Sequence, residues 1–106
     1  MAPRADTAEE IGLSLETARL MLADLAEIAK EWQALSEAER DSWSLDWDNE
    51  MAGVARLARQ AAAGNLTSEQ QDKYRHLAEG LRAALPTIRE LGLRLPSKLV
   101  TGDKAA

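Results

Sequence analysis

His76 is the only histidine in the chain, and its neighbours on a helix could make it a metal ligand. Asp72 lies four residues before it and Glu79 three residues after it, so a helix would place all three side chains on one face. Imidazole and carboxylate groups together bind divalent ions such as zinc. The same residue types are also ordinary on a water-facing surface opposite the apolar positions Leu77 and Leu81. We therefore expect a solvated helix face here and no bound metal.

Alternating carboxylates in residues 46–50 suggest a calcium loop, because Asp46, Asp48 and Glu50 have the spacing of the first ligands of an EF-hand. That loop also needs a glycine at its sixth position and a bidentate glutamate at its twelfth, where this chain has Met51 and Leu57. On a helix, moreover, Asp46 and Asp48 would point about 200° apart. We predict no calcium site in this segment.

Motifs for catalysis are also missing from the sequence. There is no Gly-x-Ser-x-Gly nucleophile motif, no phosphate-binding Gly-x-x-x-x-Gly-Lys loop and no Gly-x-Gly-x-x-Gly turn. The chain has no cysteine, which excludes thiolate chemistry and disulfides, and its single histidine would have to serve every proton transfer. We expect a protein that is not an enzyme and that needs no cofactor.

Charge is distributed unevenly along the chain. Residues 1–50 contain 13 acidic and 4 basic side chains, whereas residues 51–106 contain 5 acidic and 9 basic ones. Arg75, Arg82 and Arg89 recur every seven residues, so on one helix they would form a basic ridge that contacts phosphates, an acidic partner or the acidic half of the same chain. We favour the contact within the chain. A net charge of −5 makes nucleic acid an improbable ligand.

Apolar periodicity and capping residues predict the elements that carry these side chains. A stripe from Ile11 to Trp32 predicts a helix that begins at about residue 8, capped by Thr7 with Glu10, or at about residue 15, capped by Ser14, and that ends at Leu35. Capping-box patterns at residues 36–39 and 67–70 predict the starts of a second and a third helix, and residues 64–65 the end of the second. Ser42 and Ser44 could allow a bend in the second helix. Pro86 predicts a kink or stop near residue 85, followed by a short turn closed at residue 92.

The composition predicts an all-α protein. It has 20 Ala and 16 Leu but only two Val and no Phe, which favours helix over strand. Short turns make neighbouring helices antiparallel, so we expect an antiparallel three-helix bundle with a short C-terminal helical turn and tail, either alone or paired into a larger bundle. Residues 1–106 would form one domain with frayed ends at 1–7 and 101–106. No apolar run has the length of a membrane span, and we expect a soluble, cytoplasmic protein.

Several leucines lie away from the predicted apolar stripes and would remain exposed in a lone bundle. Leu13 and Leu20 are one heptad apart on the first helix, Leu45 lies opposite the second stripe, and Leu95 and Leu99 lie in the tail. We expect a helical interaction module that binds itself, as a homodimer, or a protein partner through these leucines, with Arg75, Arg82 and Arg89 setting the orientation. The alternative is an acidic, antitoxin-like inhibitor whose carboxylates mask a basic site on a partner. The carboxylates of that alternative are Glu37, Glu39, Asp41, Asp46, Asp48 and Glu50.

Overall fold

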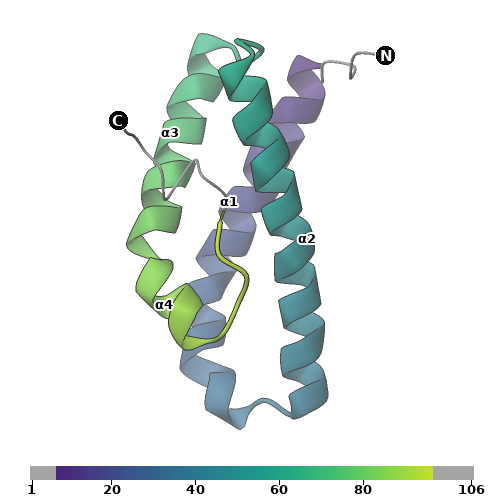
Figure 1. Cartoon of the computed structure of the whole chain (residues 1–106), viewed down its shortest axis with the longest axis vertical. Coiled ribbons are helices and arrows are strands. Elements are labelled where there is room, and N and C mark those ends of the chain that lie inside the picture. Colours follow the sequence, from purple (N-terminus) through teal and green to yellow (C-terminus); the bar gives the residue numbers. More distant parts are fainter. Residues whose placement is uncertain (1–6, 97–106) are drawn as a thin grey trace.

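The computed structural model describes residues 7–96, and this part of the chain is all-helical, with no strand (Figure 1). Four α-helices pack together: α1 (Ala8–Glu31), α2 (Glu37–Ala62), α3 (Ser68–Ala83) and α4 (Leu85–Glu90). A short 3₁₀ turn, η1 (Trp32–Ala34), follows α1. The α1 helix packs along both α2 and α3, and α4 packs against α3. The helix that contains Leu13 and Leu20 is therefore also the one that joins the other two long helices.

Capping boxes begin all three long helices, as the sequence predicts. At each start, a side-chain hydroxyl accepts from the backbone N–H three residues on, and the side chain of that residue accepts from the capping residue's own N–H. The N-caps are Thr7, Ser36 and Thr67. For α1 the structure selects Thr7 over Ser14, the other candidate cap. The Thr7 hydroxyl accepts a hydrogen bond from the Glu10 N–H at 3.1 Å.

The turn between α1 and α2 is tighter than the sequence indicates. The α-helix ends at Glu31 and not at Leu35, since residues 32–34 narrow to a 3₁₀ turn. Arg40 from the first turns of α2 stabilises this corner: its Nε donates to the Trp32 carbonyl at 2.8 Å, and its guanidinium lies 5.8 Å from the centre of the Trp32 ring. The possible bend at Ser42 and Ser44 does not form, and α2 is a single helix.

The end of α2 and the break between α3 and α4 lie at the glycine and proline positions where the sequence predicts them. After α2, Gly64 adopts a φ of +79°, which a residue with a side chain rarely adopts. The third helix ends at Ala83, and α4 begins at Leu85 with Pro86 in its first turn, where the missing N–H costs no hydrogen bond. Gly92, with a φ of +73°, closes α4. The stop expected near residue 85 is confirmed.

The core lies where α1 meets α2 and α3. Its fully buried members are large side chains from every α-helix: Ile11, Leu25, Trp47, Val54, Leu57, Leu81 and Ile88. Trp47 is completely buried, and its ring stacks on that of Trp43 with the ring centres 5.6 Å apart. Trp43 itself is half-buried.

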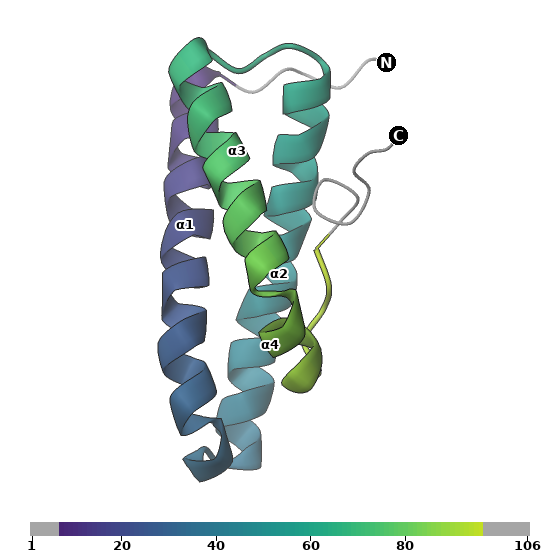
Figure 2. The same cartoon turned by 90° about the vertical axis from the view of Figure 1, so that its left-hand side faces the viewer.

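The segment after α4 completes the hydrophobic core. Residues 91–96 run back beside α2 in both views (Figures 1 and 2). The Trp47 indole N–H donates to the Arg94 carbonyl at 2.8 Å, the Arg94 guanidinium lies 3.4 Å from the Asp48 carbonyl, and Leu93 is buried. The first part of the C-terminal segment is therefore docked on α2.

None of the helices in residues 7–96 has the length and apolar character needed to cross a membrane.

Candidate functional site

Two exposed leucines lie on the outer face of α1. Leu13 is 65% exposed and Leu20 is 49% exposed, although both are large apolar side chains in the middle of a well-formed helix. Seven residues separate them, so they lie on one face and about 10 Å apart along the helix axis. The inward-facing Ile11, Leu15 and Ala18 of the same helix are all buried. The structure thus leaves two aligned apolar side chains without cover from the described part of the chain.

Carboxylates surround this pair of leucines. Glu9, Glu16, Asp24, Glu27 and Glu31 are all exposed on α1. The two basic residues of the helix pair locally: Arg19 donates to Glu16 at 2.6 and 3.2 Å, and the Lys30 ammonium lies 3.5 Å from Glu27. Hydrogen bonding from Arg19 lowers the pKa of the Glu16 carboxyl. The remaining charge of the outer face is negative. We call Leu13, Leu20 and these carboxylates the α1 outer face.

The other candidate leucines do not join this surface. Leu45, 61% exposed, lies on α2, and Leu95, 42% exposed, lies in the segment after α4. Leu99 lies outside the described residues. Each of the two described leucines is a single exposed apolar side chain, which is common on protein surfaces. Among residues 7–96, only the α1 outer face presents two exposed leucines at helical spacing.

The expected arginine ridge is divided between two helices. Arg75 and Arg82 belong to α3, whereas Arg89 belongs to α4, because the chain breaks its helix at Ala84. Arg75 pairs with Asp72 of its own helix at 3.0 Å. The expectation that this arginine pairs with the acidic first half is therefore wrong, since a carboxylate one turn away on the same helix is closer.

The candidate metal ligands do not converge on a common point. The Asp72 carboxylate is engaged by Arg75, and His76 and Glu79 are exposed. Within residues 7–96, no group of three or more His, Asp or Glu side chains is arranged to hold a metal ion. Among the described residues, Asp72, His76 and Glu79 therefore do not form a metal site.

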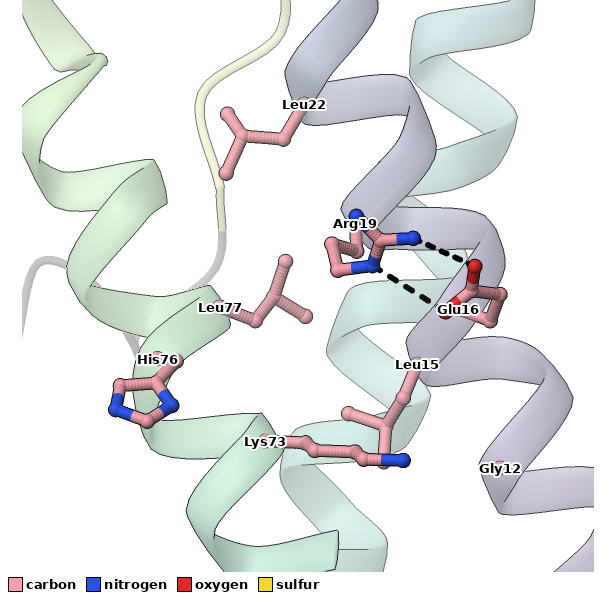
Figure 3. Close-up of a pocket in the computed structure, with 8 residues that line it drawn as sticks. All are labelled: Gly12, Leu15, Glu16, Arg19, Leu22, Lys73, His76 and Leu77. Carbon is pink, nitrogen blue, oxygen red and sulfur yellow. Dashed lines mark hydrogen bonds and ion pairs between the residues drawn. The ribbon is translucent and has the colours of Figure 1, made fainter.

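A groove between α1 and α3 is the feature that sequence reasoning missed. It has a volume of about 210 Å³, and its walls come from both helices (Figure 3). The lining residues are Gly12, Leu15, Glu16, Arg19, Leu22, Lys73, His76 and Leu77. Figure 3 shows Leu22 and Leu77 facing each other across it. The available signal was Gly12, which lies beside the apolar stripe of the first predicted helix and has no side chain to fill the space next to it.

Comparison of the chain with protein-family models, with curated proteins and with solved structures finds no match.

Proposed function

We propose that this chain is a non-enzymatic protein-interaction module that binds its partner through the α1 outer face. The single observation that carries the proposal is the exposure of Leu13 and Leu20 on one face of a rigid helix. Covering both side chains would contribute about 2–3 kcal/mol to binding, from the apolar area that each still presents to water. Two leucines alone make a weak contact, so neighbouring charges must provide the remaining specificity.

The protein scaffold that we propose for this surface is an antiparallel three-helix bundle of α1, α2 and α3, closed at one end by α4. Tight turns at residues 32–36 and 63–67, together with the course of the chain in Figures 1 and 2, support this description. In this bundle α1 packs against both α2 and α3, which leaves one face of α1 outward. We place the protein in the cytoplasm, because a chain without cysteine suits a reducing compartment.

The charges on the α1 outer face indicate what the partner should look like. If two copies paired through this face in an antiparallel manner, Glu9 of one copy would approach Asp24 and Glu27 of the other, and like charges would oppose the contact. A partner helix with apolar residues flanked by lysine or arginine would meet the same face favourably. We therefore propose a basic, amphipathic partner segment in preference to a homodimer.

Affinity capture from the native host tests the proposal when it is run with matched variants. We expect the wild-type protein to retain a defined partner that Leu13→Glu and Leu20→Glu each lose. Leu45→Glu serves as the control, because it introduces the same charge at an exposed leucine outside the α1 outer face. Sedimentation of the purified protein checks for self-association. Retention of the partner by both α1 variants, or a stable dimer that Leu20→Glu dissociates, would contradict the proposal of a basic partner.

A second candidate function is the masking of a basic site by charge alone. Exposed carboxylates at Glu37, Asp41 and Asp46 of α2 favour it. The three other members of the candidate acidic set are less available, because Asp48 and Glu50 are half-buried, and the Glu39 carboxylate accepts the Ser36 N–H. If charge drives binding, raising the salt concentration should release the partner of wild type and of Leu20→Glu alike.

A further inference from the structure

The groove between α1 and α3 is closed at both ends by contacts between the two helices. At one end the Gln70 side-chain amide donates to the Ala8 carbonyl at 2.7 Å. At the other end α3 passes so close to α1 that a Cβ on Gly80 would lie 2.7 Å from the Leu22 side chain. Between these contacts the helices leave a bounded groove of about 210 Å³.

The floor of the groove is apolar and its open side is polar. Leu15, Leu22 and Leu77 supply apolar atoms from both helices, and Gly12 supplies no side chain to fill the space above them. A Cβ built on Gly12 would lie 3.7 Å from the Gln70 side-chain nitrogen, an ordinary contact distance, so nothing crowds this position. The groove can therefore accept an apolar body that lies along α1.

The polar groups at the mouth are mainly hydrogen-bond donors. The only carboxylate in the lining, Glu16, has both oxygens occupied by Arg19. In Figure 3 the Lys73 side chain extends from α3 across the groove toward Leu15. The distance from its ammonium nitrogen to the Glu69 carboxylate is 3.8 Å, which is too long for a hydrogen bond. The N–H groups of the ammonium can therefore still donate to a ligand. His76 adds a further ring nitrogen at the mouth.

We propose that this groove binds a small amphipathic carboxylate, with its hydrocarbon chain on Leu15, Leu22 and Leu77 and its carboxylate at Lys73. The volume corresponds to about seven water molecules, from the share of about 30 Å³ that each occupies in the liquid, which suits a chain of about six carbons. The cationic group at the mouth selects an anion over an alcohol or an amine of the same length. This groove shares only Glu16 with the α1 outer face, and its lining includes neither Leu13 nor Leu20, so binding here does not depend on the partner of that face.

Titrations followed by NMR of backbone amides test the site with three probes of equal chain length: hexanoate, hexanol and hexylamine. We expect saturable chemical-shift changes at Gly12, Leu22 and Leu77 with hexanoate. The affinity for hexanol should be about fivefold weaker, because hexanol lacks one solvent-exposed charge contact and such a contact changes affinity by about this factor. Lys73→Met should reduce the affinity for hexanoate to that for hexanol. Lys30→Met, which removes a lysine of α1 outside the groove, is the matched control and should leave binding unchanged.

A variant whose new side chain fills the groove distinguishes loss of the binding site from loss of the fold. Gly12→Leu should occupy the groove and abolish hexanoate binding, while circular dichroism and thermal unfolding show a folded protein of equal or higher stability, because leucine favours helix over glycine. Gly12→Ala, with an ordinary contact distance for its Cβ, should remain folded and bind hexanoate more weakly than wild type. Equal affinity for all three probes, hexanoate binding that survives in folded Gly12→Leu, or no saturable shift would overturn the proposal. Leu20→Glu should bind hexanoate normally, which distinguishes this inference from the proposed partner surface.

Discussion

Replacing Trp47 by phenylalanine tests whether the segment after α4 is held to α2 as the structure shows. The Trp47 side chain is fully buried, and its indole N–H donates to the Arg94 carbonyl at 2.8 Å. Phenylalanine cannot make this hydrogen bond, a loss of about 1 kcal/mol, and it has three fewer buried non-hydrogen atoms, a loss of about 2 kcal/mol. We therefore expect Trp47→Phe to lower the free energy of unfolding by about 3 kcal/mol, which corresponds to a Tm decrease on the order of 10–20 °C.

Urea and thermal unfolding measured by circular dichroism give the change, and Trp43→Phe is the matched control. Trp43 stacks on Trp47 but is only half-buried, so its replacement should cost less than half as much. Hydrogen exchange of the two indole N–H groups adds a direct measurement. The Trp47 indole should be protected and the Trp43 indole should exchange quickly, and deletion of residues 93–106 should remove the protection.

Two results would refute this reasoning. The first is a Trp47→Phe variant no less stable than Trp43→Phe, because the burial and the hydrogen bond of Trp47 would then contribute nothing measurable. The second is equal exchange rates for the two indole groups in the wild-type protein, because the indole of Trp47 would then not be held by the Arg94 carbonyl in solution.

Three further changes test other parts of the structure. Gly53→Ala should raise the free energy of unfolding by about 0.5–1 kcal/mol through helix propensity. Gly80→Ala should raise it less, because the new Cβ would displace the Leu22 side chain, and urea unfolding compares the two variants. Ser36→Ala should cost about 1 kcal/mol in the same assay by removing the N-cap of α2, and a neutral effect would mean that the cap is dispensable. Partial burial raises the pKa of the Glu50 carboxyl, so its protonated form stabilises the fold at low pH, and this stability is lost as pH rises through the folded pKa. Glu50→Gln should therefore have a higher Tm than wild type at pH 7 and lose that advantage below about pH 4; a constant difference across this range would argue against the burial of Glu50.

Local sequence determined where the three long helices begin and where the helical chain breaks after α2, but not where α1 ends. A capping box uses atoms within four residues of one another, so the patterns at Thr7, Ser36 and Thr67 predict helix starts without knowledge of the remaining fold. The proline at position 86 and the glycine at position 92 act in the same local way on the last turns. The exposure of Leu13 and Leu20 also follows from the sequence, because helical periodicity places them opposite a stripe that must be buried.

Tertiary structure alone decided the features that depend on distances between helices. The Trp47–Arg94 hydrogen bond joins residues 47 positions apart, and nothing in either segment specifies the other as its partner. The groove exists because α1 and α3 touch at Gly80 and at Gln70 and diverge between them, and this spacing depends on how all the core side chains pack together. Arg75 pairs with Asp72 on its own helix because a partner one turn away needs no particular packing of the bundle. Charge balance between the two halves of the sequence could not distinguish that local pair from a contact between helices.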